Sequence, residues 1–162
     1  MKKIFKFIYI IIAVSLTSYL CSKFTHIGLS NWYNNLNKPF LTPPNIVFPI
    51  VWSIIYTLIV ISSFLAMRDT QNSQQAKVNN YFLAQLFLQI LWCFIFFAEG
   101  YLGLGFAIIV LLDITVFKMI SVFTKINKLA SVLLYPYYWW LMFATFLNFN
   151  YIYNFGLIIV LQ

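Results

Sequence analysis

Five long and mostly apolar stretches divide this sequence of 162 residues. A helix needs about 20 apolar residues to cross the hydrocarbon core of a bilayer, and each stretch is close to that length. Backbone polar groups in lipid have no water to bond, so such stretches are expected to be helical. The sequence therefore predicts an all-α membrane protein, in which residues 1–162 form a single domain with a bundle of five transmembrane helices. The predicted spans are residues 7–22, 47–67, 81–98, 104–122 and 131–153.

The composition supports a lipid environment. Hydrophobic residues make up 63% of the chain and charged residues 8%, whereas a soluble domain of this size needs far more polar surface. The lysines that precede the first stretch would also suit a cleaved signal peptide. Tyr19-Leu20-Cys21 is a poor cleavage site, however, and the apolar run is long for a signal, so a retained first helix is favoured.

The basic residues are unevenly distributed between the two predicted sides of the membrane. With five crossings, the N-terminus shares one side with the second and fourth loops, and this side holds eight of the ten basic residues. Cytoplasmic loops carry an excess of Lys and Arg, so we expect a cytoplasmic N-terminus in a bacterial cell membrane, or the mitochondrial outer membrane in a eukaryote. The net charge of +7 is spread over these loops, which argues against a nucleic-acid partner. The eight residues are Lys2, Lys3, Lys6, Arg68, Lys77, Lys118, Lys125 and Lys128, and the opposite side holds Lys23 and Lys38.

Residues 23–46 form a long first loop whose second half is rich in proline. Long loops are often functional, and proline restricts the backbone to extended conformations. We therefore interpret this loop as a stiff lid over the helix ends, with a plain connector that carries one interfacial tryptophan as the alternative. The candidate lid residues are Trp32, Lys38, Pro39, Pro43 and Pro44.

Polar and aromatic side chains follow helical spacing in three of the spans. The hydrophobic effect does not separate inside from outside in a bilayer, so these stripes mark faces that point inward. An interior lined by rings and a few amides suits a planar, mostly apolar ligand, but the same groups serve equally well in helix packing. The stripes are Trp52, Tyr56, Ile59 and Ser63 in the second span, Gln85, Gln89, Trp92 and Phe96 in the third, and Trp140, Ala144, Leu147, Asn148 and Tyr151 in the fifth.

Few other residues carry recognisable chemistry. Asp113 lies in the middle of the fourth span with apolar neighbours on its own face; it could relay protons, bind a ligand or pack against another helix, and packing is favoured. Cys21, Cys93 and His26 match neither the spacing of a metal site nor a disulfide framework. We therefore expect no metal and no catalytic residue, because no motif of a conventional hydrolase or nucleotide enzyme is present in the sequence.

Three longer blocks join these residues into motifs. The first runs from Trp32-Tyr33 through Lys38-Pro39 and Pro43-Pro44 to Val47-Phe48-Pro49, Trp52 and Tyr56. The second runs from Gln85-Leu86 through Gln89 and Trp92-Cys93 to Phe96-Phe97, and the third from Leu133-Leu134-Tyr135-Pro136-Tyr137 through Trp140 and Phe143-Ala144-Thr145 to Leu147-Asn148. Together they resemble, over nearly the whole chain, the TspO/MBR family of tryptophan-rich sensory proteins, whose animal member is the translocator protein, or peripheral benzodiazepine receptor.

The resemblance implies a five-helix bundle, often dimeric, that binds porphyrins, benzodiazepine-site ligands and, in animals, cholesterol. For this chain it implies a homodimer in the lipid bilayer with a porphyrin or haem as ligand, and no obligatory cofactor. The pocket would be capped by the first loop. By position it would use Trp52, Trp92, Phe96, Trp140, Ala144 and Leu147, to which helical spacing adds Tyr56, Gln89 and Asn148.

The chain departs from the family pattern at several positions. Gln89 stands where Asn is usual, and Cys93 stands where Ser is common. No Lys or Arg follows Lys128, so the basic residue of the family's cholesterol pattern is missing and sterol recognition is not expected.

We expect a membrane receptor or carrier for tetrapyrroles, with a role in regulating tetrapyrrole or stress responses. It is not expected to be an enzyme, although the resemblance permits slow or light-assisted porphyrin breakdown. The alternatives are a proton-coupled transporter of a small solute, with Asp113 as the coupling group, and a structural membrane assembly protein whose polar stripes only pack helices.

Overall fold

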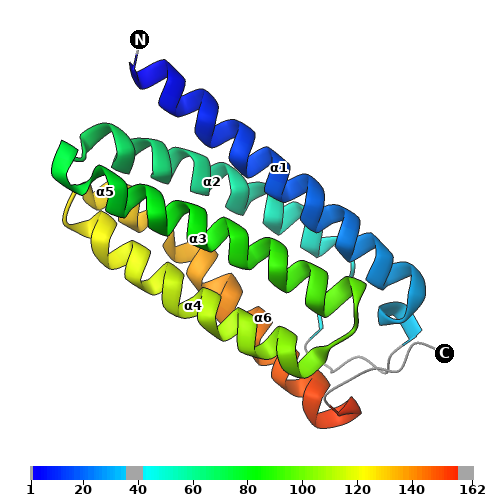
Figure 1. The fold of residues 1–162 in the computed structure, drawn as a ribbon. Coiled ribbons are helices and arrows are strands. Elements are labelled where there is room, and N and C mark those ends of the chain that lie inside the picture. Colours follow the sequence, from blue (N-terminus) through cyan, green and yellow to red (C-terminus); the bar gives the residue numbers. More distant parts are fainter. Residues whose placement is uncertain (1, 36–41, 157–162) are drawn as a thin grey trace.

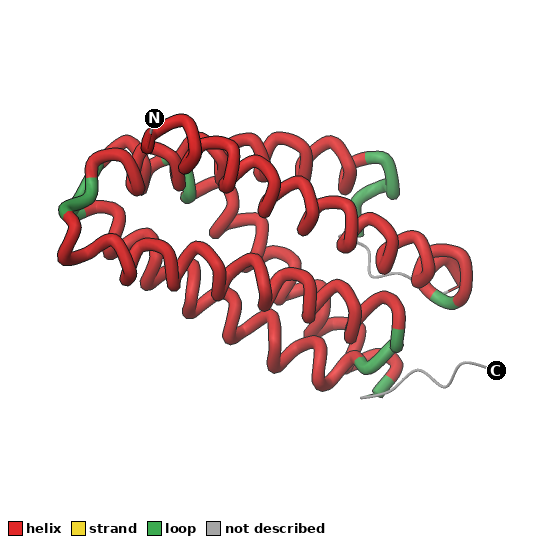
Figure 2. Tube along the Cα trace, turned by 45° about the horizontal axis from the view of Figure 1, so that its top comes forward, coloured by secondary structure: helices red, strands yellow, loops and turns green. Residues whose placement is uncertain are grey.

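Helices account for almost all of the structure, a computed structural model that describes residues 2–35 and 42–156 (Figure 2). Among these residues, five helical segments are long and apolar enough to cross a bilayer. The prediction of an all-α bundle with five transmembrane helices is therefore confirmed. In chain order the elements are α1 (Lys2–Asn31), η1 (Tyr33–Asn35), α2 (Val47–Asp69), η2 (Asn72–Gln74), α3 (Gln75–Cys93), η3 (Phe94–Ala98), α4 (Leu102–Thr124), α5 (Lys128–Val132) and α6 (Tyr135–Phe155).

The spans are arranged as a ring of neighbours (Figure 1). α1 packs against α2 and α3, α3 runs beside α4, α4 packs against α6, and α5 and α6 return to α2. α5 and α6 together make the fifth span, and η3 completes the third. The N-terminal end, the α2–α3 turn and the α4–α5 turn lie at one end of the bundle, and the end of α6 lies at the other. This antiparallel order is what short connections between long helices produce.

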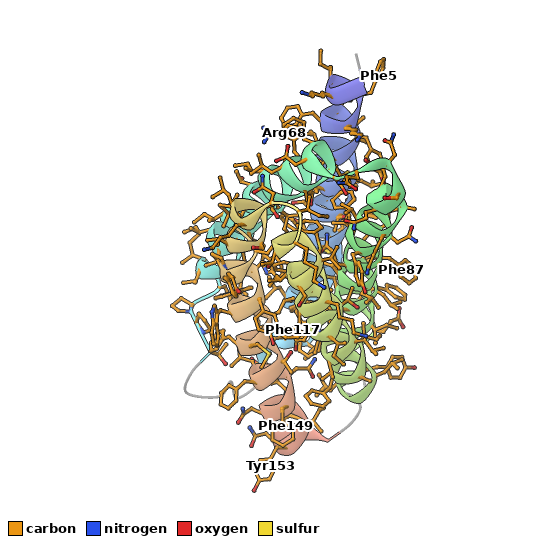
Figure 3. The ribbon with its side chains drawn as sticks, turned by 90° about the vertical axis from the view of Figure 1, so that its left-hand side faces the viewer. Phe5, Arg68, Phe87, Phe117, Phe149 and Tyr153 are labelled. Carbon is orange, nitrogen blue, oxygen red and sulfur yellow. The ribbon has the colours of Figure 1, made fainter. Side chains whose placement is uncertain are left out.

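Large apolar side chains also cover the outside of the bundle (Figure 3). Phe87 on α3, Phe117 on α4 and Phe149 on α6 are 64%, 57% and 54% exposed. Water would not tolerate so wide an apolar surface, whereas the hydrocarbon core of a bilayer solvates it. The protein is therefore a multi-pass membrane protein.

Some predicted boundaries were wrong. α1 continues to Asn31, well beyond the predicted end at residue 22, so the first part of the predicted loop is helical. The prediction placed the end of the span where polar residues begin. A helix forms its own backbone hydrogen bonds, however, and can continue beyond the lipid core. The third span likewise begins at Asn72 rather than at residue 81, and the fifth at Lys128 rather than at residue 131. The second and fourth spans agree with the prediction within two residues.

A close contact with η3 fixes the position of α1. A Cβ atom at Gly28 would lie 2.7 Å from the carbonyl oxygen of Phe97, so only glycine lets the two backbones approach this closely. The indole N–H of Trp32, one turn later, donates to the same oxygen at 2.9 Å. η3 is a π-helical turn, in which the Glu99 N–H bonds back to the Phe94 carbonyl at 3.1 Å. Such a turn is wider than an α-helical one, and here it accompanies two consecutive buried rings, Phe96 and Phe97.

Candidate ligand-binding site

A cavity of about 390 Å³ lies between α1, α2, α3 and α6, with η1 and η3 at its border. This volume falls within the range of roughly 300–1,000 Å³ that is typical of small-molecule sites. Among the described residues, the lining includes no Lys, Arg, Asp or Glu side chain. The cavity is therefore suited to a ligand whose buried part carries no charge.

Aromatic rings form the wall that α2, α3 and α6 contribute. On α2, the rings of Trp52 and Tyr56 lie one turn apart, with their centroids 5.5 Å from each other. Trp140 on α6 packs against Phe48 at a centroid distance of 6.0 Å, and Trp92 lines the cavity from α3. Within the described chain, the indole nitrogens of Trp92 and Trp140 are buried without a hydrogen-bond acceptor. This wall therefore offers flat ring surfaces to a ligand.

Most of the predicted ligand-binding residues meet at this cavity. The structure places six of the nine in its lining, namely Trp52, Tyr56, Gln89, Trp92, Trp140 and Ala144. Helical spacing identified them because each stripe lies on a face that α2, α3 or α6 turns toward the same space.

Phe96, Leu147 and Asn148, the other three predicted residues, lie outside the described cavity lining. Phe96 stacks on the far side of the pocket ring Trp92, with centroids 5.6 Å apart, and packs closely over Gly105 of α4. Asn148 is 1% exposed and also lies beside Gly105, while Leu147 is buried in the same cluster. The missing side chain of Gly105 lets α4 approach Phe96 and Asn148.

α1 supplies a polar wall that the sequence reasoning missed. Ser18, Ser22, Thr25 and Leu29 line the cavity at i, i+4, i+7 and i+11, and His26 lies at the same border. The same spacing that revealed the other stripes is present here. The predicted boundary between the first helix and the loop falls after residue 22, which separates Ser18 and Ser22 from Thr25 and Leu29 and hides the stripe.

A hydrogen-bonded network underlies the boundary between α3 and α6. The Tyr137 hydroxyl group lies 3.0 Å from the side-chain oxygen of Gln85 and 3.3 Å from that of Gln89. The Gln89 amide then donates to the Cys93 sulfur at 3.7 Å. Of the two glutamines, Gln89 lies in the described cavity lining and Gln85 does not. The hydrogen bonds fix the orientation of the Gln89 side chain at the cavity.

Two described residues between α1 and α2 reach the cavity. Tyr33 and Asn45 line the cavity, and the Tyr151 hydroxyl group donates to that of Tyr33 at 2.9 Å. Burial raises the pKa of the Tyr33 phenol well above its usual value, and the neighbouring Tyr151 raises it further, so Tyr33 stays neutral. Trp32 is 5% exposed and packs in the core instead of covering the cavity. Pro43 and Pro44 are outside the described lining, and Lys38 and Pro39 are outside the described residues.

Asp113 lies away from the cavity, between α4 and α6. Its Oδ2 atom accepts a hydrogen bond from the Thr145 hydroxyl at 2.7 Å, and the side chain is 8% exposed. This is the packing contact with a polar group of another helix that the sequence favoured. Oδ1 is buried without a partner among the described residues.

The chain is similar to known proteins over most of its length. The model of the TspO/MBR family matches residues 7–154. The Tryptophan-rich protein TspO of Archaeoglobus fulgidus is 37% identical over 147 residues, which cover 90% of this chain and 94% of that protein. The Tryptophan-rich sensory protein of Cereibacter sphaeroides is 35% identical over 119 residues, covering 74% of this chain and 73% of the relative. The human Translocator protein is 30% identical over 140 residues, which cover 85% of this chain and 83% of that protein.

These matches agree with the architecture. The matched region contains all five spans almost completely, and both the aromatic wall and the polar wall of the cavity fall inside it. The sequence blocks that carried the resemblance therefore belong to one continuous match, and the chain is a member of the TspO/MBR family.

Proposed function

We propose that this protein binds a porphyrin or a related planar, largely apolar ligand in the cavity between α1, α2, α3 and α6, as a membrane receptor or carrier. The observation that carries the proposal is the convergence of Trp52, Trp92 and Trp140 from three helices on one cavity of about 390 Å³. Aromatic rings bind flat conjugated molecules through offset stacking and edge contacts. Relatives named as a sensory protein and as a translocator support a role in sensing or carrying a ligand.

The contrast between the two walls supports an amphipathic ligand. Rings from α2, α3 and α6 suit the apolar face of a macrocycle, while the hydroxyl groups of Ser18, Ser22 and Thr25 on α1 suit a polar edge. Ser22 and His26 are exposed where they meet the border of the cavity, so the polar edge would lie nearest to the opening.

The position of Asp113 gives less support to a proton-coupled transporter. The carboxyl group bonds to Thr145 and is absent from the described cavity lining, so a solute in the cavity would not touch it. A purely structural role accounts for Asn148 and Phe96, which pack against α4, but it leaves the cavity itself without a purpose.

Titration of the purified protein with protoporphyrin in detergent tests the proposal. Bound porphyrin should quench the intrinsic tryptophan fluorescence and shift the porphyrin absorbance band. The Trp52→Ala, Trp140→Ala double variant should bind roughly tenfold more weakly or worse, because each lost ring contact contributes about 0.5–1.5 kcal/mol beyond its buried area. Affinity of this variant is read from porphyrin absorbance, since two fluorophores have been removed.

Trp139→Ala is the matched control. Trp139 neighbours Trp140 on α6 but is 68% exposed and lies outside the described cavity lining, so its removal should leave the affinity unchanged. Equal affinity of the double variant and the parent would show that the pocket is wrongly placed. Porphyrin extracted after long incubation in the dark and in light should have its original spectrum, whereas a changed spectrum would indicate turnover.

A further inference from the structure

Two buried cysteines meet at the wall of the cavity. Cys21 comes from the middle of α1 and Cys93 from the last residue of α3, and both thiols are free. They are 6% and 3% exposed, and both line the cavity. They lie far apart along the chain, so the fold alone brings them together.

Hydrogen bonds hold both thiols at the same turn of α3. The Cys21 thiol donates to the backbone oxygen of Gln89 at 3.7 Å, and the Gln89 side-chain amide donates to the Cys93 sulfur, also at 3.7 Å. Cys93 follows Gln89 by one helical turn, so both sulfur atoms are hydrogen-bonded to the same residue, Gln89. The two thiols therefore meet around Gln89 at the interface between α1 and α3.

The docking of α1 keeps this arrangement in register. Cys21, Gly28 and Trp32 are at i, i+7 and i+11, which is one face of the helix. Gly28 and Trp32 both meet the Phe97 carbonyl, so α1 cannot rotate or slide without losing these contacts. Two thiols that are held beside one residue by a fixed helix contact are well placed to form a disulfide.

We propose that Cys21 and Cys93 are an oxidation site, at which a hydroperoxide that enters the cavity converts the two thiols into a disulfide between α1 and α3. One thiol attacks the peroxide: an S–O bond forms, the O–O bond breaks, and water or an alcohol leaves. The second thiol then attacks the resulting sulfenic acid, so that the S–S bond forms and water leaves. The two cysteines lose two electrons and two protons in total, and the peroxide is reduced.

The bridge would regulate the ligand site. A covalent S–S bond is much shorter than the contact between two thiols, so it draws α1 toward α3 at the turn that carries Gln89. α1 carries the polar wall, and the cavity therefore becomes narrower between Ser18 or Ser22 and the aromatic wall. Porphyrin should bind more weakly to the oxidised protein. This consequence rests on the proposed function, whereas the disulfide itself does not.

Counting free thiols tests the oxidation site. The full chain in detergent is reduced, treated with hydrogen peroxide or with tert-butyl hydroperoxide, denatured, alkylated and weighed by mass spectrometry. The reduced parent should take up two alkyl groups and the oxidised parent none, with a monomer band on a non-reducing gel. The apolar peroxide should act faster if the oxidant enters from lipid, and hydrogen peroxide if it enters from water.

Single-cysteine variants supply the control. Cys21→Ser and Cys93→Ser cannot form the bridge, so each should trap a sulfenic acid that reacts with dimedone; Cys21→Ala is available if a serine variant does not fold. Three results would each overturn the proposal. They are two alkyl groups on the treated parent, dimedone adducts on the parent in place of a bridge, and a disulfide-linked dimer.

Porphyrin titration before and after oxidation tests the regulation. Oxidation should weaken binding to the parent by about fivefold or more, the usual scale of coupling between two sites, and a thiol reductant should restore it. The affinity of the Cys21→Ser, Cys93→Ser double variant should be the same before and after peroxide, which controls for methionine oxidation. An unchanged affinity of the bridged parent would refute the regulatory effect. Absence of porphyrin binding in both states would refute the proposed function and leave the disulfide result intact.

Discussion

Gly28 is the residue at which the packing of α1 depends most directly on a missing side chain. A Cβ there would meet a backbone carbonyl, that of Phe97, at 2.7 Å. At Gly105 the nearest atoms are side-chain carbons of Phe96 at 3.2 Å. A side chain can move by a few tenths of an ångström, whereas a carbonyl held in η3 cannot do so without disturbing the turn.

Gly28→Ala should therefore destabilise the protein. Overpacking costs about 1–3 kcal/mol, and displacement of α1 also weakens the Trp32 hydrogen bond, which together exceed the gain of about 1 kcal/mol from alanine's helix preference. A thermal melt in detergent should show a decrease in Tm of about 2–8 °C. Gly105→Ala is the matched control and should change Tm much less. A Gly28→Ala protein as stable as the parent would show that α1 is not held at this contact.

Residue-level prediction from the sequence worked where one helix face carried the whole signal. Trp52, Trp92 and Trp140 could be identified because each lies on a helical stripe of rings and polar side chains, and all three line the cavity. Gly28 and Cys21 could not be singled out, because only the tertiary fold brings them to the Phe97 carbonyl and the Gln89 backbone oxygen. Phe96 has the correct spacing, yet it faces α4, since spacing alone does not say how wide the stripe of pocket residues is.

Among the elements, α5 shows how a polar residue positions a short helix. Asn127 is its N-cap, and its side-chain oxygen accepts from the Ala130 N–H at 2.9 Å. Its amide also donates to Asp69 Oδ2 at 2.6 Å, which connects the start of α5 to the end of α2. Arg68 donates to both oxygens of the same carboxylate, at 2.6 Å to Oδ1 and 2.9 Å to Oδ2. One side chain thus begins a helix and joins it to another.

Substitutions at Asn127 should separate these two roles. Asn127→Ala removes both bonds, and loss of the cap alone costs about 0.5–2 kcal/mol. Asn127→Ser keeps an N-cap oxygen but loses the amide, so thermal melts should rank the parent above Ser and Ser above Ala. If the serine and alanine variants have the same Tm, the bond to Asp69 is the important one. If all three proteins have the same Tm, the cap contributes nothing to stability.

The length and polarity of the elements explain which of them could be predicted. The second and fourth spans begin and end where their apolar residues do, so the length of the apolar stretch was sufficient to predict their boundaries. α1 extends into polar residues that face the cavity or the loop side, which hydropathy treats as a boundary. The π-helical turn at Phe94–Ala98 has no sequence signal, because its residues are ordinary apolar ones and its shape accompanies tight packing against Gly28.

On the scale of the whole molecule, the fold gathers most of the positive charge at one end. Phe5 and Arg68 lie at this end and Tyr153 at the other (Figure 3). Lys6 donates to the Met67 carbonyl and to the Gln75 side-chain oxygen, both at 2.8 Å, and so anchors the start of α1 beside the α2–α3 turn. A single orientation in the membrane is what this asymmetry favours.

We expect the basic end to face the cytoplasm. Ser30 near the end of α1 and Ser73 in the α2–α3 turn are both exposed and lie toward opposite ends. In a background without Cys21 and Cys93, Ser30→Cys should react with a membrane-impermeant maleimide on intact cells, and Ser73→Cys only after permeabilisation. The reverse pattern would mean that the charge asymmetry does not determine orientation here, and labelling of both in intact cells would indicate mixed orientations.

The contact of Gly28 and Trp32 with Phe97 also places the steps of biogenesis in order. Trp32 and its acceptor are 65 positions apart, so α1 has left the ribosome long before its docking surface has been made. Until η3 has been made, the first helix can pack against α2 but lacks its contact with Phe97. The binding cavity therefore comes into existence late in synthesis, when the oldest part of the chain meets a newer one.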